Sequence, residues 1–420
     1  MSHFELRNGE LHAEHVPLSR IAAEVGTPVY VYSRAQLEDN ANALREGLSV
    51  LPRVHLAYAV KANPNLAVVN VLAKCGYGAD IVSAGEMYRA MAGGVPAADI
   101  VFSGVGKKIA EMEAALDAGI GQFNIEIEEE GRVLSDLALA RGTRAQAVLR
   151  VNPDVDAGTH AKISTGKAEN KFGVAISDAP AIFGRLATLP GLVMRGVATH
   201  IGSQIADLDP LETTYRRIGE LVAHLRSSGH TITHVDLGGG FGIPYTPGEL
   251  YPSAESIGQM IARATDGWDV TLMFEPGRVI AGNAGVLLTE VIWVKPGVGH
   301  PWVIVDAAMN DLARVALYDA HHEFTAVRPT GEKMIANIAG PVCESGDTFA
   351  KAREIDVVAR DDLAVLHTAG AYGATMASTY NSRALVPEVM VDGDRYAVVA
   401  DRIASSTIMA AERLPEWLAA

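Results

Sequence analysis

The chain has 420 residues, more than one ordinary hydrophobic core accommodates, and its length therefore predicts two domains. With 49% apolar and 20% charged residues it has the composition of a folded globular protein, which excludes a disordered one. The formal net charge of −15 argues against nucleic-acid partners, and no apolar run reaches the roughly 18–20 residues of a membrane span.

The start of the chain and its cysteines indicate a cytoplasmic protein. Residues 1–7 contain no basic stretch followed by an apolar core, so no secretory signal is expected. Cys75 and Cys343 are too far apart to have the spacing of metal ligands, and we expect no metal site. A reducing compartment is the simplest interpretation.

Strand and helix patterns alternate from about residue 54 to residue 280. Apolar runs predict eight strands, at 54–60, 79–82, 99–102, 121–125, 145–151, 193–199, 233–237 and 270–274. Helical stretches lie between them, for example at 108–118, 127–141, 211–228 and 255–265. Ser83-Ala84-Gly85-Glu86 has the capping-box pattern of a helix start, and Gly229 suits a helix end. Eight strands that each precede a helix favour an α/β fold with a closed (β/α)₈ TIM-type barrel, which we place at residues 34–280.

The chain on either side of this region has a different texture. After residue 280, apolar runs at 286–294, 302–306, 363–367 and 396–400 are separated by Gly, Pro and Asp. The strand-like segment 27–32 lies outside the count of eight, and we expect it to pair with the C-terminal sheet. Residues 1–33 and 281–420 are therefore predicted to form a second, β-rich domain of sandwich or barrel type.

Lys61 stands at a place where barrel enzymes carry their chemistry. The apolar run 55–60 precedes it and Asn63-Pro64 ends the strand, so Lys61 follows the carboxyl end of a strand. In an apolar setting a lysine has a lowered pKa, and its neutral amine is a Schiff-base nucleophile. The alternative is a lysine that extends to solvent or pairs with a carboxylate.

Two glycine-rich loops predict a phosphate site on the same rim. Strand seven ends in the segment Asp236-Leu237-Gly238-Gly239-Gly240-Phe241-Gly242, whose glycines let backbone N–H groups approach an anion. Strand eight ends in Glu275-Pro276-Gly277-Arg278, which adds an arginine. Loops after strands seven and eight commonly bind phosphate in such barrels, although each loop alone is equally explained as a tight turn.

A reactive lysine beside a phosphate site points to pyridoxal phosphate. Glu275 could hold a proton on the pyridine nitrogen, which keeps the ring an electron sink. His200, at the end of strand six, could stack on the ring, and Ser203 could donate to the phosphate. A single histidine at a strand end is more often structural.

Three segments of the β-rich region carry weaker signals. Residues 340–347, GPVCESGD, place the thiol of Cys343 beside Glu344 between glycines, which also suits a polar turn. Arg314 and Tyr318 are four residues apart and share a face if the segment is helical. Tyr372 lies between glycines, where its hydroxyl could reach a phosphate.

Together these motifs resemble the alanine-racemase-like, fold-type III pyridoxal-phosphate decarboxylases, most closely the diaminopimelate decarboxylases. The resemblance covers nearly the whole chain, and the motifs occur in the family's order: YAVKAN at 58–63, HIGSQ at 200–204, GGGFG at 238–242, EPGR at 275–278, CESGD at 343–347 and GAYG at 370–373. It implies a barrel with a β-domain and a homodimer in which the CESGD segment of one subunit reaches the cofactor of the other.

The resemblance also implies a role for each residue. Lys61 carries the cofactor, His200 stacks on its ring, Glu275 binds the pyridine nitrogen, and Cys343 is the proton donor from the partner subunit. The phosphate ligands are Ser203, Gly239, Gly240, Gly277, Arg278 and Tyr372. The substrate contacts are Arg278, Arg314, Tyr318, Glu344 and Tyr372. Val315 stands where the family usually has proline, which affects only the local backbone.

The distal end of the substrate distinguishes the reactions known for this fold. Diaminopimelate carries an ammonium and a carboxylate there, and Arg314 with Glu344 would match both, whereas ornithine or lysine would leave Arg314 unpaired. We therefore expect decarboxylation of meso-2,6-diaminopimelate to L-lysine, the final step of lysine biosynthesis. The alternatives are a decarboxylase of ornithine, arginine or lysine, a catalytically silent pyridoxal-phosphate-binding protein, and a cofactor-free Schiff-base aldolase.

Overall fold

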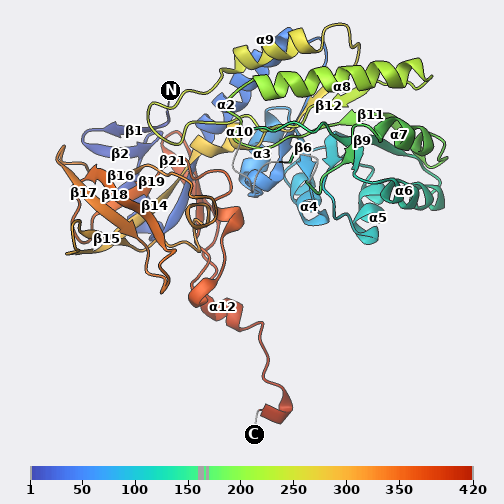
Figure 1. Cartoon of the computed structure of the whole chain (residues 1–420). Coiled ribbons are helices and arrows are strands. Elements are labelled where there is room, and N and C mark those ends of the chain that lie inside the picture. Colours follow the sequence, from blue (N-terminus) through green and yellow to red (C-terminus); the bar gives the residue numbers. More distant parts are fainter. Residues whose placement is uncertain (1, 159–164, 167–169, 419–420) are drawn as a thin grey trace. The chain divides into compact units, whose positions relative to one another are not determined.

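The computed structural model describes residues 2–158, 165–166 and 170–418 (Figure 1). Contacts within the chain divide it into two compact units. The barrel unit comprises residues 38–244 and 250–280. The β-rich unit comprises residues 1–37, 245–249 and 281–420.

Eight parallel strands close the barrel. They are β5 (Val54–Ala59), β6 (Gly78–Ile81), β7 (Ile100–Phe102), β8 (Gln122–Ile125), β9 (Ala145–Asn152), β11 (Leu192–Ala198), β12 (His234–Asp236) and β13 (Thr271–Phe274). Each strand pairs in parallel with its neighbours, and β13 returns to pair with β5. A two-residue strand, β10 (Val174–Ala175), adds to β9. The predicted eight strands and their closure are confirmed.

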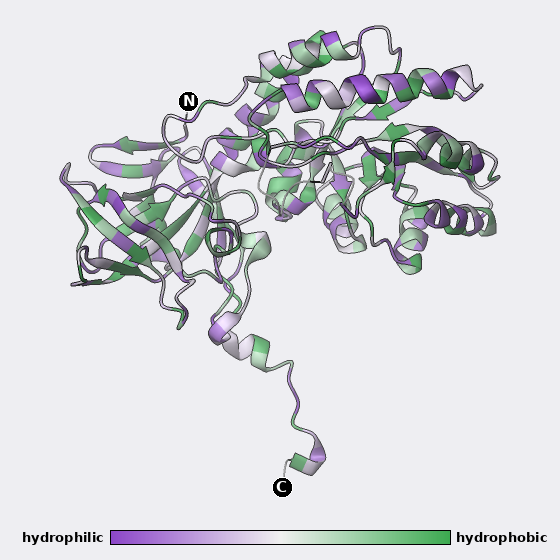
Figure 2. Cartoon of the chain, viewed as in Figure 1, coloured by the Kyte–Doolittle hydropathy of each residue, from purple (hydrophilic) through white to green (hydrophobic). Residues whose placement is uncertain are grey.

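Helices precede, connect and follow the strands of the barrel. They are α2 (Arg34–Gly47), α3 (Leu66–Lys74), α4 (Ala84–Ala92), α5 (Ile109–Ala118), α6 (Glu128–Ala140), α7 (Ala179–Ala187), α8 (Asp209–Ser227), α9 (Ala254–Ala264) and α10 (Arg278–Ala281). Figure 2 shows polar and apolar residues mixed along α8, whose buried residues recur at helical spacing: Leu211, Thr214, Tyr215, Ile218, Leu221, Val222 and Leu225. Across the described part of the chain, every helix is too short or too polar to span a membrane.

Local capping follows the sequence. The Ser83 hydroxyl accepts a hydrogen bond from the Glu86 backbone N–H and begins α4. The Glu86 carboxylate accepts from the N–H of Val82, one residue earlier than the usual capping-box partner. Gly229, with φ of +87°, follows the end of α8, as predicted.

The β-rich unit contains a mixed sheet with the strand order β18-β17-β15-β14-β4-β20-β21, in which β19 pairs with β14 and β16. Its strands are β4 (Val29–Ser33), β14 (Gly285–Lys295), β15 (Trp302–Val305), β16 (Phe324–Ala326), β17 (Lys333–Ala339), β18 (Thr348–Asp356), β19 (Leu363–Leu366), β20 (Glu388–Asp392) and β21 (Arg395–Ala400). The N-terminal strand β4 pairs with β14 and β20, so the expected pairing of the N-terminal segment with the C-terminal sheet is confirmed.

Smaller elements complete this unit. A separate three-stranded sheet contains β1 (Phe4–Arg7), β2 (Glu10–Ala13) and β3 (Val16–Pro17), and the helices are α1 (Leu18–Val25), α11 (Arg314–Tyr318) and α12 (Ser405–Met409). An apolar core that includes Leu18, Val31, Leu288, Val365 and Val389 joins α1 to the sheet. Arg314 and Tyr318 both lie on α11, four residues apart, so they share a helical face as predicted.

Candidate active site

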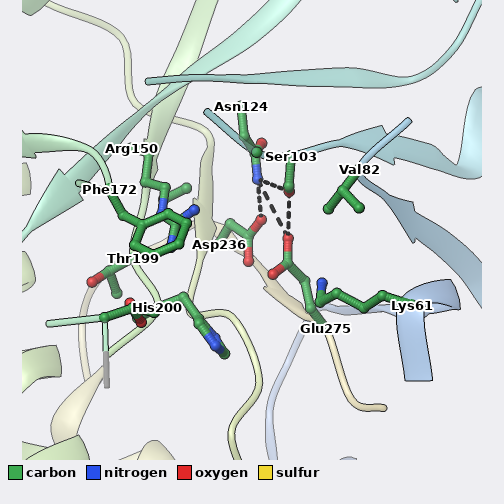
Figure 3. A pocket seen from close by; sticks show the side chains of 13 residues that line it. Lys61, Val82, Ser103, Asn124, Arg150, Phe172, Thr199, His200, Asp236 and Glu275 are labelled. Atoms are coloured by element: carbon green, nitrogen blue, oxygen red, sulfur yellow. Dashed lines mark hydrogen bonds between the residues drawn. The ribbon is translucent and has the colours of Figure 1, made fainter. Parts of the chain in front are cut away.

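A cavity of about 200 Å³ lies at the carboxyl ends of the barrel strands. Figure 3 shows Lys61, Asp236, Glu275 and His200 reaching into the same space from different strand ends. The complete lining is Lys61, Val82, Ser103, Gly104, Asn124, Arg150, Thr165, Phe172, Ala198, Thr199, His200, Asp236 and Glu275. The structure thus brings the predicted lysine, histidine and glutamate together.

Lys61 follows β5 in a short 3₁₀ turn, Val60–Ala62. Its ammonium forms an ion pair with Asp80 on β6, whose side chain is fully buried. Lys61 therefore lies beyond the carboxyl end of a strand and lines the cavity, as predicted, but it has a carboxylate partner where we expected an apolar setting. The buried carboxylate holds the amine at the wall of the cavity, because removing an unpaired charge from water is costly.

Glu275 follows β13 and belongs to a buried polar network. The Ser103 hydroxyl donates to Glu275 Oε1 over 3.1 Å. The Asn124 amide donates to Asp236 Oδ2 over 3.0 Å and to Glu275 Oε1 over 3.4 Å. Burial, followed by the Asp236 and Asp80 carboxylates, raises the pKa of Glu275 well above its ordinary value, and burial also raises the pKa of Asp236.

This arrangement fits a cationic ring nitrogen. The carboxyl groups of Glu275 and Asp236 line the cavity, and the Asp80 carboxylate, which pairs with Lys61, lies near enough to contribute to the raised pKa of Glu275. A positive charge beside Glu275 would offset the repulsion that raises its pKa. A protonated pyridine nitrogen supplies such a charge.

His200 follows β11 and is held as a neutral ring. The Gly239 backbone N–H donates to His200 Nδ1 over 3.2 Å, and the Thr165 hydroxyl donates to the His200 carbonyl over 2.7 Å. Burial, with the charges of Arg150 and Lys61, lowers the pKa of His200 to about 3. Its ring is therefore uncharged at neutral pH, which suits stacking on an aromatic cofactor.

The glycine loop after β12 leaves no room for side chains. A Cβ on Gly239 would lie 2.2 Å from the Glu275 carbonyl oxygen, and one on Gly240 would lie 2.4 Å from the Gly202 carbonyl oxygen. Gly240 also has φ of +98°, a conformation that favours glycine. A bare backbone of this kind lets N–H groups approach an anion such as phosphate closely.

Arg278 and Ser203 meet on the same side of the barrel. Arg278 is buried at the start of α10, and its Nη2 and Nε donate to the Ser203 hydroxyl over 3.0 and 3.3 Å. A Cβ on Gly277 would come within 3.0 Å of Ala62, so the loop after β13 packs closely on the turn that carries Lys61. A guanidinium and a hydroxyl side by side can bind a phosphate together.

Several site residues were not predicted. Arg150 on β9 donates to Glu126 over 2.7 Å, and its guanidinium lies 4.7 Å from the Phe172 ring centre. Asp80, Ser103 and Asn124 were also missed, and no role was predicted for Asp236. These residues share one sequence feature that could have identified them: each is a polar residue within or directly after a predicted barrel strand.

The remaining predicted residues belong to the β-rich unit. Arg314 is 5% exposed, donates to His322 Nε2 over 2.8 Å and lies 4.4 Å from the Tyr245 ring centre. Burial, and then Arg314, lowers the pKa of His322 to about 3, so this histidine is a neutral acceptor. Arg314 shares α11 with Tyr318, which is partly exposed.

The CESGD and GAYG segments lie on loops. Cys343 and Glu344 are both exposed, and the Tyr380 hydroxyl donates to Glu344 over 2.9 Å. The Cys343 backbone N–H donates to Asn381 over 3.3 Å. Tyr372 has φ of +57°, and its glycine neighbours pack closely, since a Cβ on Gly373 would lie 2.4 Å from the Ala369 carbonyl oxygen.

Comparison with known proteins identifies the family. Residues 34–282 match the family model described as the pyridoxal binding domain of pyridoxal-dependent decarboxylases. The chain is 50% identical over 418 residues to a diaminopimelate decarboxylase of Zymomonas mobilis, with 99% of each chain covered. The chain belongs to the diaminopimelate decarboxylases.

Other members agree with this over the full length. A diaminopimelate decarboxylase of Pseudomonas aeruginosa is 47% identical, with 99% of each chain covered. The crystal structure of the M. jannaschii diaminopimelate decarboxylase in complex with L-lysine has a TM-score of 0.95 at 34% identity, covering 99% of this chain and 98% of that one. The expected family, the barrel with its β-rich domain and the pyridoxal cofactor are thereby confirmed.

Proposed function

We propose that this chain removes one carboxyl group from meso-2,6-diaminopimelate and releases L-lysine and CO₂. The observation that carries the proposal is the buried network of Glu275, Asp236 and Asn124 facing Lys61 across one cavity. Pyridoxal phosphate, when bound, supplies an aldehyde for amines and a ring that accepts the electron pair left behind by CO₂. The side chains of the chain hold the cofactor, bind the substrate and supply the proton.

Within the barrel unit, each group has one task. Lys61 provides the amine that carries the cofactor between turnovers. Glu275 holds a proton at the pyridine nitrogen, since a carboxylate there stabilises the positive charge. His200 covers a ring face as a neutral imidazole. The phosphate is bound by side chains and by bare backbone, namely Ser203, Gly239, Gly240, Gly277, Arg278 and, from the β-rich unit, Tyr372.

Residues of the β-rich unit bind the distal end of the substrate in this proposal. Arg314, held by His322 and by the Tyr245 ring, presents a planar donor fork for a carboxylate, and Glu344 presents an anion for the neighbouring ammonium. Tyr318 and Arg278 add contacts, and Cys343 delivers a proton to the carbon that has lost CO₂. A substrate without the distal carboxylate would leave Arg314 unpaired, and it would be rejected.

One assay tests the reaction. The purified holoenzyme is given meso-diaminopimelate, L-lysine, L-ornithine and L-arginine in separate reactions, and CO₂ and amine products are quantified. We expect CO₂ from diaminopimelate in at least about 100-fold excess over the other three, because a site with a buried polar group rejects substrates that leave this group unpaired. Comparable release from ornithine or lysine would contradict the assignment. No release from any substrate by enzyme with bound cofactor would indicate a silent binding protein.

We also propose a homodimer with shared sites, in which residues 34–280 form the cofactor domain and residues 1–33 with 281–420 supply substrate and interface contacts. The exposure of Cys343 and Glu344 within a single chain supports this, because a proton donor works best when a partner covers it. Mixing inactive Lys61→Ala with inactive Cys343→Ala subunits should restore roughly a quarter of wild-type activity, since about half of the dimers carry one intact site. If subunits demonstrably exchange and nothing is restored, Cys343 does not act across an interface.

A further inference from the structure

A second cavity, also of about 200 Å³, lies at the opposite mouth of the barrel. Its lining comes from the amino-terminal ends of the strands and the segment before β7, and it includes His55, Asp99, Gln122, Arg195, His234 and Thr271. Strand β8 illustrates the relation between the two cavities: Gln122, its first residue, lines this one, and Asn124 lines the active site. The proposed reaction leaves these residues without a role.

Two opposite charges line this cavity without pairing. Arg195 is partly buried, and its side chain makes one hydrogen bond, over 2.6 Å, to His234 Nε2. Within the described ranges, Arg195 has no carboxylate at ion-pair distance and Asp99 has no lysine or arginine. Burial lowers the pKa of Arg195, which reflects the loss of solvent around an unpaired guanidinium.

The two histidines of the lining are neutral at neutral pH. Burial, with Arg195 and His55 nearby, lowers the pKa of His234 to about 4, and burial lowers the pKa of His55 as well. The formal charges that remain are therefore one guanidinium and one carboxylate. A simple anion would meet Asp99 as well as Arg195, so a ligand that carries both charges suits this cavity better than an ion of either sign.

The lining also contains a buried hydrogen-bond acceptor, the amide oxygen of Gln122. Gln122 is 2% exposed, and its amide nitrogen donates to Asn124 Oδ1 over 2.8 Å. Its amide oxygen is buried and has no hydrogen-bond partner among the described residues, and the same holds for His55 Nε2. Buried polar atoms are rarely left unpaired in folded proteins, and an ammonium group brings three donors.

We infer that the amino-terminal mouth of the barrel binds a small α-amino acid by its head group. The carboxylate is received by Arg195, and the ammonium lies between the Asp99 carboxylate and the Gln122 amide oxygen. The cavity is smaller than the roughly 300–1,000 Å³ of common ligand pockets, so it takes a compact molecule. The hydrogen bonds from Gln122 to Asn124, and from Asn124 to Asp236 and Glu275, connect this site with the active site.

Calorimetric titration of the holoenzyme tests this inference. Borohydride first reduces the bond between Lys61 and the cofactor, so that added amino acids no longer react at the active site. Glycine, acetate and methylamine are then titrated separately. We expect saturable binding of glycine that is at least tenfold tighter than that of acetate or methylamine, because only glycine satisfies both charges. Equal binding of acetate would show a plain anion site, and the absence of glycine binding would show a solvent-filled hollow; either result overturns the inference.

Matched variants locate the binding. Arg195→Gln and, independently, Asp99→Asn should each weaken glycine binding at least tenfold while diaminopimelate turnover continues. Arg144→Gln is the control, because among the described residues Arg144 bonds the carbonyls of Pro190 and Leu192 alone, and it does not line the cavity. If Arg195→Gln does not fold, Asp99→Asn decides alone. Glycine binding that survives both substitutions would place the amino acid elsewhere.

Discussion

The barrel unit and the β-rich unit hold their candidate site residues in different ways. In the barrel unit, Glu275, Asp236 and Asn124 are buried and bound to one another, and Lys61 pairs with a buried carboxylate. In the β-rich unit only Arg314 is buried, whereas Cys343 and Glu344 are exposed. The groups that we assign to the cofactor are therefore held by contacts within the barrel unit, whereas Cys343 and Glu344, which we assign to the proton donor and the substrate, lie on an exposed loop. Substitutions in the barrel unit should consequently affect the bound cofactor or its chemistry, whereas substitutions in the β-rich unit should affect the substrate and leave the cofactor spectrum unchanged.

The largest effect is expected from Lys61→Ala in the barrel unit. No other side chain at that strand end provides an ε-amine, so turnover should fall below detection and the visible absorption of the bound cofactor should change. Absorption spectra and borohydride trapping followed by peptide mapping measure this. Lys74→Ala, at an exposed position in the last turn of α3, is the control. An unchanged spectrum with the trapped adduct on another residue would contradict the role of Lys61.

Glu275→Gln should retain the cofactor and lose most of kcat. The amide oxygen can still accept from Ser103 and Asn124, so the loop should keep its shape, but the charge at the ring nitrogen is gone. We expect a loss on the order of 100- to 1,000-fold in kcat, the range for removal of one preorganised electrostatic group. Cofactor titration and steady-state kinetics separate the two properties. The control is Glu128→Gln, a partly exposed carboxylate outside the cavity that pairs with Arg132 and Arg185. Near-normal turnover of Glu275→Gln would show that Glu275 has only a structural role in the loop after β13.

The barrel and its glycine loops were predictable because their signals are local. Most strands contain a short apolar run, and the glycine loop and Glu275 each follow their strand directly, in the peptides 236–242 and 274–278. The polar partners were not predictable in the same way. Asn124 reaches Asp236, 112 residues away, only because the barrel closes. An asparagine within an apolar strand predicts that its side chain has a polar partner. The sequence does not identify which residue that partner is.

The same limit applies to the β-rich unit. The spacing of Arg314 and Tyr318 predicted a shared helical face, which α11 provides. The residues that hold Arg314 come from elsewhere: His322 follows the helix, and Tyr245 belongs to a five-residue segment inserted from the middle of the chain. No sequence pattern predicts that Arg314 contacts these two residues; the contacts follow from the fold.

Arg314→Lys tests the substrate half of the comparison. A lysine cannot make the bidentate contact with a carboxylate and cannot bond His322 while doing so. Loss of a buried charged partner costs about 2–5 kcal/mol, or roughly 30-fold or more in kcat/KM for diaminopimelate, with the cofactor spectrum unchanged. Arg328→Lys, in an exposed pair with Glu10 of the same unit, is the control. An equal loss with a substrate that lacks the distal carboxylate would mean that Arg314 acts through the structure of the loop.

The smallest expected effect concerns stability and pH in the β-rich unit. The pKa of His322 is lowered to about 3, mainly by burial, against about 6.5 in an unfolded chain. Between these values the unfolded chain binds a proton that the folded chain excludes, so the free energy of unfolding falls as pH decreases from about 6.5 toward 3. One such group contributes a slope of up to about 1.4 kcal/mol per pH unit.

Replacing this histidine should therefore flatten the acid side of the stability profile. We expect His322→Gln to be less stable at pH 7, because Arg314 loses its best acceptor, and to lose stability more slowly than wild type between pH 6.5 and pH 4.5. Urea denaturation of the holoenzyme at half-unit pH steps measures both. The control is His224→Gln at an exposed position on α8, which should leave the slope unchanged. Because only the difference between variant and wild type is read, titration of Glu275 and Asp236, whose raised pKa values act in the opposite direction, cancels. Parallel profiles would show that His322 takes up its proton in the folded chain, and that Arg314 is then held mainly by the Tyr245 ring.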